Sequence, residues 1–373
     1  MKKILYITLE YPPVINGGSI RAKYQTEELS KEFKLFVLSK KNKTSKIRKN
    51  IKVLGVEGRA ATLIFPGAGY LLSLITKGYK TIKEEKIDCI FATSPPIVDL
   101  FAGYLLSLFT GKKLIVEVRD IWIRNFNFEI DAHKGYIKKD SLTALIARPF
   151  LKMIYKKAEK IIVTNPAIKE ELIQIHGIDE EKFEVVFNGP DLQSFAKAKT
   201  IGLKDNTLLY MGTIYKTRGV LSVLNALPDN ANLLVIGSGP GKEELRQRNK
   251  NVIIKDEVKH EDVFSYLKSA AILYVGLKPE KLWAYALPSK LLEYLGAEKP
   301  ILAIGYKNGD MDKFMKKYSL GVFVSSEDPK KINAAIIKLL KNKSYYSNNC
   351  RKAALEFSRD KQCKKLLKVC KKI

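Results

Sequence analysis

The run Pro288-Ser289-Lys290-Leu291-Leu292-Glu293-Tyr294-Leu295-Gly296-Ala297, followed by Glu298-Lys299-Pro300-Ile301-Leu302-Ala303, predicts a short helix between two turns and then a buried strand. Pro288 suits the start of a helix, where its missing N–H costs no hydrogen bond. Three leucines recur at helical spacing and give the helix one apolar face. Gly296 suits the end of the helix. The strand that follows is short and apolar, as a buried strand is expected to be.

The residues outside this apolar face are suited to binding an anion and a diol. At the start of a helix, free N–H groups on Ser289, Lys290 and Leu291 form an anion site, and Lys290 adds a full positive charge. Glu293 lies one turn later, where its carboxylate is able to accept hydrogen bonds from two sugar hydroxyls. A nucleotide presents both a phosphate and a diol. The alternative is an ordinary amphipathic surface helix with solvated charges.

The length and composition of the chain indicate a globular protein of two domains. The chain has 373 residues, which fits two domains better than one core, and 46% of them are hydrophobic, as in globular proteins. Four cysteines, Cys89, Cys350, Cys363 and Cys370, show no zinc-binding spacing. A reduced, cytoplasmic compartment is the simplest interpretation.

Two apolar stretches are too short to be membrane or export signals. Residues 4–9 follow a basic start, but they are fewer than a signal peptide needs, so we expect a first strand there. The longest uncharged run, 60–76, contains a proline and two glycines and falls short of the roughly 20 apolar residues that span a bilayer. No transmembrane helix is expected.

The formal net charge is +27, from 66 Lys and Arg against 39 Asp and Glu. Such an excess attracts nucleic acid, anionic lipid or phosphorylated substrates. The sequence shows no zinc finger, aromatic RNA-binding signature or recognition-helix pattern, so nucleic acid is not the expected partner.

Short apolar runs alternate with amphipathic helical stretches in both halves of the chain, which predicts an α/β fold with two doubly wound parallel sheets. We expect a first domain over 1–191, a linker over 192–206 and a second domain over 207–354. The expected strands of the first half are 3–8, 34–39, 88–92, 113–118, 160–164 and 183–187, and helices are expected over 20–33, 97–109 and 141–157. Those of the second half are 207–211, 232–236, 252–255, 271–275, 300–304 and 321–324.

The opening run resembles the nucleotide-sugar signature of glycosyltransferase family 4, in the variant Pro-Ser-Lys-x-x-Glu-Tyr followed by Gly-x-Lys/Arg-Pro. Ala297-Glu298 stands where the family usually has Ala-Gly. The resemblance implies that Glu293 binds the ribose hydroxyls of the donor. The broader family has a second Glu eight residues earlier, where this chain has Tyr285. The variant subgroup, which includes N-acetyl sugar transferases, lacks it too.

Two glycine-containing loops resemble the donor-binding loops of the same family. Pro12-Pro13-Val14-Ile15-Asn16-Gly17-Gly18 resembles its Pro-Pro-x-x-Gly-Gly loop, which implies that Gly17 and Gly18 lie against the donor diphosphate. A plain tight turn is the alternative. The loop from Gly212 to Gly219 resembles Gly-Arg-Leu-x-x-x-Lys-Gly, whose two cations hold the phosphates.

The second of these loops departs from the family at one cation. Arg218 falls on the Lys position, but Thr213 replaces the Arg. Lys216 or Lys290 is expected to substitute for that missing charge. An ordinary basic loop is the alternative interpretation.

Asp120 follows the expected strand 113–118, so it lies at the sheet edge where α/β proteins bind ligands. With Trp122 it resembles an Asp-x-Trp of the subgroup, and we expect it to be the catalytic acidic group on the acceptor side. A loop ion pair between Arg119 and Asp120 is the alternative. His133 is a candidate partner or simply an exposed residue.

No metal site is expected. Asp310 and Asp312 form an Asp-x-Asp, which binds metal in another glycosyltransferase fold. Here they come just before an amphipathic helix expected over 311–318, so helix capping explains them better.

Residues 134–160 have an apolar face flanked by lysines and arginines. With the apolar stretch 63–75 they predict contact with an anionic membrane surface. A core helix with lysines that extend to solvent is the alternative.

The resemblance implies a GT-B fold, in which two Rossmann-like domains face a cleft and a C-terminal helix, about 355–373, packs back on the first domain. It implies a metal-independent, retaining hexosyltransferase or N-acetylhexosaminyltransferase without a cofactor. Its donor would be a nucleotide-diphosphate sugar, a UDP-sugar above all, and its acceptor a glycan or lipid-linked hydroxyl. The location would be the cytoplasm, at the inner membrane face. Alternatives are a sugar-nucleotide epimerase of the same fold or a non-catalytic basic protein that binds nucleic acid or membrane.

Overall fold

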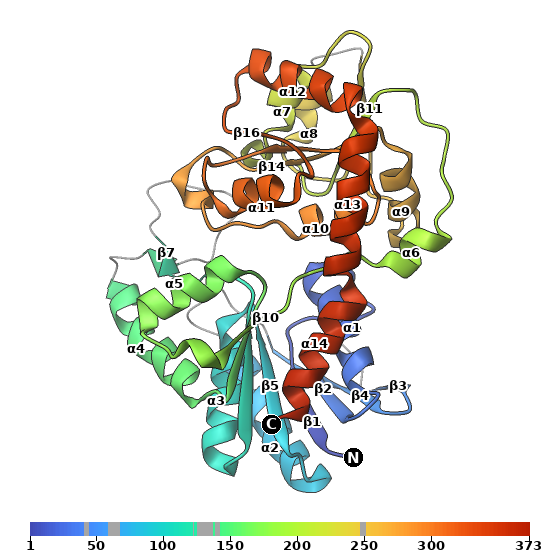
Figure 1. Ribbon diagram of the computed structural model, residues 1–373. Helices are drawn as coiled ribbons and strands as arrows, with labels where there is room; N and C mark the ends of the chain where they lie inside the picture. The colour runs from blue at the N-terminus through green and yellow to red at the C-terminus, as the bar shows by residue number, and fades with distance from the viewer. Residues whose placement is uncertain (41–44, 59–67, 122, 125–136, 139–141, 247–250) are drawn as a thin grey trace. The chain divides into compact units, whose positions relative to one another are not determined.

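The computed structural model describes residues 1–40, 45–58, 68–121, 123–124, 137–138, 142–246 and 251–373. The chain forms two compact units, each built on its own sheet (Figure 1). Unit 1 contains residues Met1–Phe187 and Lys361–Ile373, and unit 2 contains Asn188–Asp360.

The described residues of unit 1 form an eight-stranded sheet in the order β10-β9-β6-β5-β1-β2-β4-β3. All neighbours are parallel except β3 and β4, and the strand order reverses between β1 and β5. The strands are β1 (Lys3–Ile7), β2 (Lys34–Lys40), β3 (Ser45–Arg48), β4 (Ile51–Val56), β5 (Cys89–Ser94), β6 (Lys113–Val118), β9 (Lys160–Val163) and β10 (Phe183–Val185). A separate pair joins β7 (Ile123–Arg124) and β8 (Ile137–Lys138).

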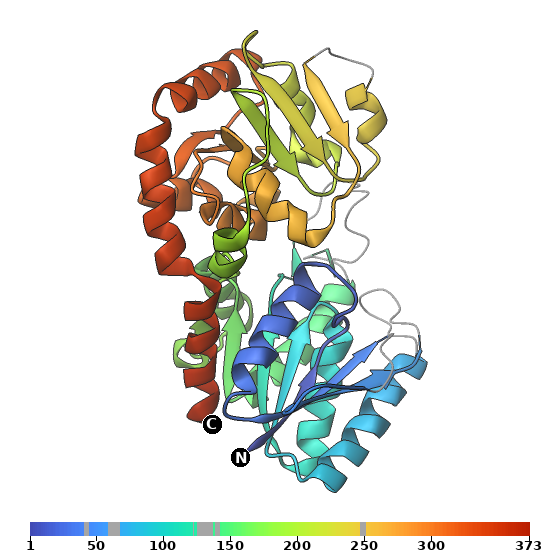
Figure 2. The same ribbon diagram turned by 90° about the vertical axis from the view of Figure 1, so that its right-hand side faces the viewer.

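Helices cover both faces of this sheet. One face packs on helices α2 (Ala68–Glu85), α3 (Ile97–Thr110), α4 (Leu142–Lys157) and α5 (Pro166–His176), with buried side chains from each in a single core. The other face packs on α1 (Gly17–Leu29) and the last helix, α14 (Arg359–Lys371), whose Leu366, Val369 and Cys370 join the core there (Figures 1 and 2). The alternation of strand and helix in the sequence therefore yields a sheet that is buried on both sides.

Unit 2 has a six-stranded parallel sheet in the order β13-β12-β11-β14-β15-β16, which reverses between β11 and β14. Its strands are β11 (Thr207–Met211), β12 (Asn232–Ile236), β13 (Val252–Lys255), β14 (Ile272–Gly276), β15 (Ile301–Ile304) and β16 (Gly321–Val324). Its helices are α6 (Leu192–Lys197), α7 (Val220–Leu224), α8 (Lys242–Arg246), α9 (His260–Ser269), α10 (Ser289–Leu295), α11 (Asp310–Tyr318), α12 (Pro329–Lys341) and α13 (Lys343–Phe357).

The predicted pair of doubly wound parallel sheets is confirmed, and most strands lie within a residue or two of their expected bounds. The sequence analysis missed β4, in which Ile51, Val53 and Val56 are buried. Lys52 and Gly55 interrupt its apolar pattern, which hid the strand. The segment 192–206, expected as a linker, begins with helix α6. Helix α1 begins at Gly17 rather than at residue 20, because Asn16 caps it by accepting from the Ser19 amide.

Gly296 ends helix α10 as predicted, but for a different reason. Its φ is −66°, which any residue adopts, so left-handed geometry is not what requires glycine. A Cβ at this position would lie 2.4 Å from the Phe195 ring and 2.9 Å from Pro190. Close approach of the α6 region to α10 is therefore the constraint on this residue.

Gly237 gives the sharpest test of backbone packing in unit 2. It has φ +147°, and a Cβ there would lie 2.1 Å from the carbonyl oxygen of Gly212. We expect Gly237→Ala to lower the free energy of unfolding by on the order of 2–4 kcal/mol, because it adds backbone strain and a backbone clash. The measurement is urea denaturation of the whole chain. The control is Gly202→Ala, which meets open space and should leave stability within about 0.5 kcal/mol; equal effects of the two substitutions would contradict the argument.

Candidate active site

In unit 2 the predicted donor residues gather at the edge of the sheet where the strand order reverses. The loop that begins at Gly212 follows β11, and α10 is the first α-helix after β14. Open α/β sheets bind ligands at the carboxyl ends of the strands at such a reversal. The fold thus brings two sequence motifs, about 80 residues apart, to one place.

Lys290 is the residue that connects these two motifs. Its Nζ donates to the carbonyl oxygen of Met211 at 2.9 Å and lies 4.3 Å from the centre of the Tyr210 ring. Burial, with a smaller contribution from the positive charge of Arg218, lowers the pKa of Lys290 to about 7. The ammonium is therefore close to its titration point at neutral pH, and a nearby anion would stabilise its charged form.

Gly212 lies directly at the Lys290 ammonium. Its φ is +129°, and a Cβ built on it would lie 2.7 Å from Lys290 Nζ. A side chain at position 212 would therefore occupy the space beside the ammonium. Glycine at this position leaves that space open for a ligand.

Arg218 and Lys216 belong to a short 3-10 turn, η2 (Lys216–Arg218), in the same loop. The turn is held on β14 because the Tyr274 hydroxyl donates to the Arg218 carbonyl oxygen at 2.6 Å. Lys216 is exposed, whereas Arg218 is half-buried and close enough to Lys290 to affect its pKa. Lys216 and Arg218 of this loop and Lys290 of α10 thus belong to elements that meet at the same edge of the sheet.

Glu293 accepts hydrogen bonds at both carboxylate oxygens. Oε2 accepts from Nη2 of Arg359, and Oε1 accepts from the backbone N–H of Asp191 at 3.3 Å. Burial raises the pKa of Glu293, and the charge of Arg359 opposes that rise. The side chain remains 23% exposed, so the carboxylate still faces solvent in part.

The expected cluster of three free amides at the start of α10 is wrong for Leu291. Its N–H donates to the carbonyl oxygen of Pro288 at 3.0 Å, because the chain closes its first turn there, and its side chain is fully buried. Ser289 is exposed at the first position of the helix. Leu291 is therefore a core residue, whereas Ser289 stays a candidate.

In unit 1 the predicted residues lie at the carboxyl ends of β1 and β6. Gly17 and Gly18 form the first turn of α1, and a Cβ on Gly18 would lie 2.9 Å from Nη1 of Arg119. Arg119 donates from Nε to the Ser94 carbonyl at 2.7 Å, and among the described residues it forms no ion pair with Asp120. Asp120 is half-buried just beyond β6. Trp122 and His133, named with it, lie outside the described residues.

A buried polar network supports this edge of unit 1. Glu117 accepts from Nη2 of Arg21 at 2.8 Å and from Nε2 of Gln25 at 2.6 Å. Burial opposes ionisation of Glu117, but Arg21 and Arg119 together hold its pKa below the usual value. The carboxylate is thus charged and holds the Arg21 side chain of α1 in place.

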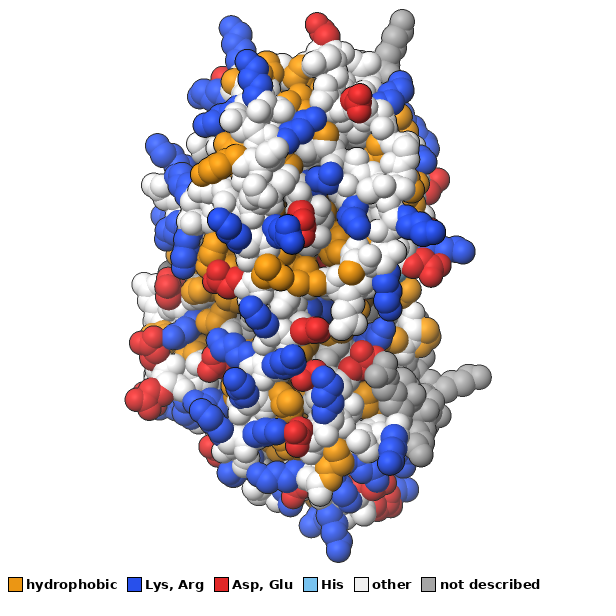
Figure 3. All heavy atoms as spheres, turned by 45° about the vertical axis from the view of Figure 1, so that its right-hand side comes forward, with side chains coloured by type: hydrophobic (Ala, Val, Ile, Leu, Met, Phe, Trp, Pro, Cys, Tyr) orange, Lys and Arg blue, Asp and Glu red, His pale blue; other side chains and the backbone are white. Residues whose placement is uncertain are grey.

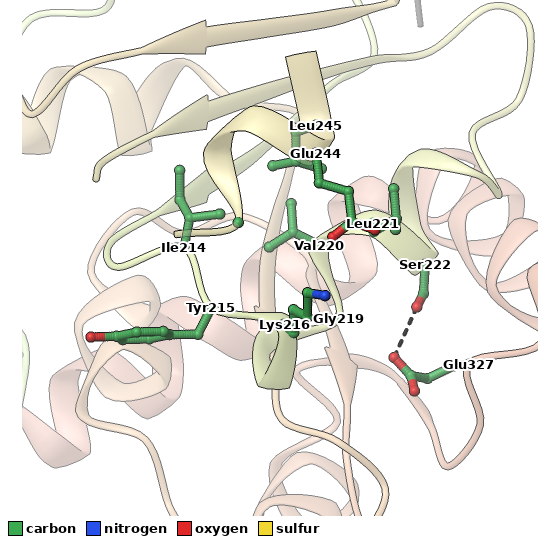
Figure 4. A pocket seen from close by; sticks show the side chains of 11 residues that line it. Ile214, Tyr215, Lys216, Gly219, Val220, Leu221, Ser222, Glu244, Leu245 and Glu327 are labelled. Atoms are coloured by element: carbon green, nitrogen blue, oxygen red, sulfur yellow. Dashed lines mark hydrogen bonds between the residues drawn. The ribbon is translucent and has the colours of Figure 1, made fainter. Parts of the chain in front are cut away.

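A cavity of about 150 Å³ opens beside the η2 loop in unit 2 (Figure 4). Ile214, Val220 and Leu245 line it with apolar side chains, and at another side of it Glu327 accepts from the Ser222 hydroxyl at 2.8 Å. Lys216 lines the cavity, but Lys290 and Glu293 do not. The cavity therefore lies next to the gathered donor residues rather than among them.

Searching the described residues for a metal finds no group of three or more His, Cys, Asp or Glu side chains placed to bind one. Asp312 is buried and accepts from the Asn308 amide at 2.8 Å and from Lys316 at 2.9 Å. The N-cap residue of α11 is Gly309, and Asp310 and Asp312 both lie in the first turn, where a carboxylate complements the helix dipole.

Two arginines at these edges were not identified from the sequence. Arg119 follows a predicted buried strand in the same way as Asp120, and this position is the signal that could have identified it. Arg359 gave no usable signal, because it is 66 residues from Glu293 and lies in a lysine-rich C-terminal stretch.

Two family models match the chain, one in each half. Residues 193–357 match the family model described as glycosyl transferases group 1, and residues 15–194 match the model of glycosyltransferase family 4. The first model covers the sheet edge at β11 and α10 in unit 2, and the second covers the Gly17–Gly18 turn in unit 1. Together these matches support the assignment of the chain to family 4 of the glycosyltransferases, with the GT-B arrangement of two Rossmann-like domains.

Individual relatives are distant. An uncharacterised glycosyltransferase of Methanocaldococcus jannaschii is 24% identical over 57% of this chain and 56% of its own length. An N-acetylgalactosaminyltransferase of Campylobacter jejuni that acts on a diphospho-undecaprenol glycan is 26% identical over 32% of this chain and 34% of its own. The chain thus spans about half or less of the length of these two relatives.

Solved structures agree on the fold. Sucrose-phosphate synthase from Thermosynechococcus elongatus has a TM-score of 0.78 at 14% identity, over 100% of this chain and 99% of its own. The Anabaena protein HepE, solved in complex with UDP, has a TM-score of 0.68 at 14% identity, with both chains covered fully.

Two further observations concern the charge of the surface and the apolarity of the helices. Lys and Arg side chains are spread over the whole face seen in Figure 3 and outnumber Asp and Glu there. Within the described part of the chain, no helix has both the length and the apolarity that crossing a membrane requires.

Proposed function

We propose that the protein transfers a sugar from a nucleotide-diphosphate sugar, a UDP-sugar above all, to an acceptor hydroxyl of a glycan or lipid-linked glycan. The observation that carries this proposal is the meeting of Gly212, Arg218 and Lys290 at one sheet edge of unit 2. A partly buried ammonium, an arginine and an open glycine position suit a diphosphate. Glu293 follows Lys290 by one turn and would accept from the ribose hydroxyls.

The chemical role of these cations is to stabilise the departing diphosphate as the glycosidic bond to it breaks. Lys290 and Arg218, with Lys216 at the rim, would balance negative charge that develops on the leaving group. Fixed positive charge in this position would let the reaction run without a bound metal, and no organic cofactor is required. The distant relatives that act on polyprenol-linked glycans or bind UDP are consistent with this chemistry.

In unit 1 the Gly17–Gly18 turn and Asp120 would serve the acceptor side. Asp120 lies beyond the carboxyl end of β6, half-buried and unpaired with Arg119, so its carboxylate is available to orient an acceptor hydroxyl. We assign retention of the anomeric configuration and the N-acetyl sugar subgroup on the resemblance of the Pro288–Tyr294 motif.

Contact with an anionic membrane is a second proposal, which would bring the enzyme to a lipid-linked acceptor at the inner face. Helices α2, α3 and α4 cover one face of the unit 1 sheet, and their outer sides carry exposed apolar residues, including Leu72 at 62%, Phe109 at 64% and Leu145 at 69%. Lys156 and Lys157 are exposed on α4 beside Met153. Exposed apolar groups among lysines suit an interface with anionic lipid.

The first prediction concerns the ribose contact. In titration calorimetry without metal, we expect UDP or GDP to bind, and Glu293→Ala to weaken that binding by about 10- to 100-fold, because two hydrogen bonds to a charged acceptor are lost. The matched control is Glu298→Ala, an exposed residue just beyond α10. If the folded wild type binds neither nucleotide, the function proposed here is wrong.

The second prediction concerns pH. Because the pKa of Lys290 is lowered to about 7, its ammonium is fully charged below that pH and is lost above it. The affinity for the nucleotide sugar should therefore be constant below about pH 7 and fall by up to about tenfold per pH unit above it, until the higher pKa of the complex is passed. The nucleotide sugar carries a constant charge over this range, so the protein causes the change.

The control for this pH dependence is Lys290→Arg, which keeps its charge at every pH used. Its affinity should vary less than threefold between about pH 6 and pH 9. A wild-type profile that is flat over the same range would contradict the role of Lys290.

The third prediction concerns the membrane. In vesicle co-sedimentation at low salt, the protein should bind phosphatidylcholine vesicles that contain phosphatidylglycerol and not phosphatidylcholine alone. The double change Leu145→Ser, Met153→Ser should weaken binding about tenfold, since it removes two inserted apolar groups. Leu355→Ser, at a residue 54% exposed on α13 of unit 2, is the control. An equal loss in both proteins would argue against a specific α4 surface.

A further inference from the structure

Arg359, the first residue of α14, contacts Glu293 and the chain segment 189–191 at the same time. Its Nη2 donates to Oε2 of Glu293, its Nε donates to the carbonyl oxygen of Gly189 at 3.0 Å, and its Nη1 lies 3.9 Å from Oδ2 of Asp191. Its own N–H donates to the Pro190 carbonyl oxygen at 3.0 Å. The Arg359 side chain is only 14% exposed, and these contacts hold its guanidinium in place.

The carboxylate of Glu293 is held by protein donors on both oxygens but is not saturated. Arg359 donates to Oε2, and the Asp191 N–H donates to Oε1 at 3.3 Å. A carboxylate has about four lone-pair sites, so each oxygen keeps one for another donor. Two neighbouring hydroxyls of a ribose are donors at a spacing that suits two acceptors on one carboxylate.

We propose that Arg359 is a positioning residue for nucleotide binding, which holds the Glu293 carboxylate ionised and oriented so that it accepts from the ribose diol of the donor. The inference rests on the proposed function, because it concerns the ribose contact of that same site. Arg359 acts through Glu293 and does not touch the nucleotide itself.

Electrostatics give Arg359 a second effect besides orientation. Burial raises the pKa of Glu293, the charge of Arg359 lowers it, and the negative charge of Asp191 raises it. Two elements that pack on α10 are β14 and α13. Strand β14 has no charged side chain, and the Arg351 side chain of α13 lies 3.9 Å from Glu298 and does not contact Glu293. Without Arg359 the Glu293 carboxyl would take up a proton at a higher pH and lose one acceptor.

The test is the ratio of affinities for UDP and 2′-deoxy-UDP, or for the guanine pair if GDP is the nucleotide that binds. This ratio isolates the ribose 2′-hydroxyl, because titration of the phosphates and of Lys290 affects both ligands equally. In the wild type we expect UDP to bind roughly tenfold tighter or more, at every pH from about 6 to 9. Arg359→Met should bring the ratio to within about twofold of one at pH 6, with partial recovery toward pH 9.

Two further variants separate positioning from a merely structural role. Arg359→Lys keeps a cation near Glu293 and should keep most of the ratio with no dependence on pH. Arg351→Met removes an arginine from α13 that is 66% exposed and does not contact Glu293, so the ratio should not change. Thermal melting and circular dichroism establish that each variant is folded.

Each outcome decides the inference. A folded Arg359→Met protein that keeps the wild-type ratio at all pH values, or that weakens UDP and 2′-deoxy-UDP equally, would overturn it. If Arg359→Met does not fold, two other variants decide. Arg359→Lys must keep a ratio of affinities that does not vary with pH, and Glu293→Gln, which leaves the contact of Arg359 with Gly189 in place, must bring the ratio close to one at every pH. Failure of either expectation also overturns the inference. A wild type that binds no nucleotide removes the proposed function itself, which is a different result from a wild type that binds but ignores Arg359.

Discussion

The hydrogen bond from Lys290 to the Met211 carbonyl is the interaction on which the candidate site depends. It fixes the first turn of α10 against the end of β11, two elements that meet only because the sheet order reverses between β11 and β14. This contact buries the Lys290 ammonium, which is unfavourable for its charged form and lowers its pKa to about 7. Stacking on Tyr210 and one carbonyl compensate in part, so an incoming diphosphate would complete the neutralisation of this charge. The buried ammonium is thus suited to an anionic ligand.

The features of the fold that could be predicted from the sequence are those that depend on residues close together in the chain. The strands of unit 2 were predicted almost to the residue, because each is a short apolar run bounded by turn residues. Strand β4 was missed, since Lys52 and Gly55 break its pattern and its assignment needs the neighbouring β2. Gly296 was placed correctly as the end of α10, but its requirement comes from the Phe195 ring, which is about 100 residues away in sequence.

In the candidate site, too, local motifs could be predicted from the sequence and contacts between distant residues could not. Gly212, Arg218, Lys290 and Glu293 were selected from motifs, and the structure brings the first three together at one edge; their role stays a prediction. The free amide expected at Leu291 failed because the Pro288 carbonyl accepts it, a detail of turn geometry that no sequence pattern encodes. Arg359 could not be found, because contacts between residues 66 positions apart depend on the tertiary path of the chain.

The pairing of Arg359 with Glu293 also bears on the diphosphate site proposed above. A lone carboxylate one turn from Lys290 would repel the phosphates that the cations attract, and it would weaken the field of those cations. With Arg359 at Oε2, the pair is close to neutral when seen from the phosphate position, yet the carboxylate keeps lone pairs for hydroxyl donors. The net charge of +27 does not supply this arrangement, since the basic side chains in Figure 3 are spread over the surface. A cation placed directly on the Glu293 carboxylate would therefore let the proposed ribose acceptor lie beside the proposed phosphate site.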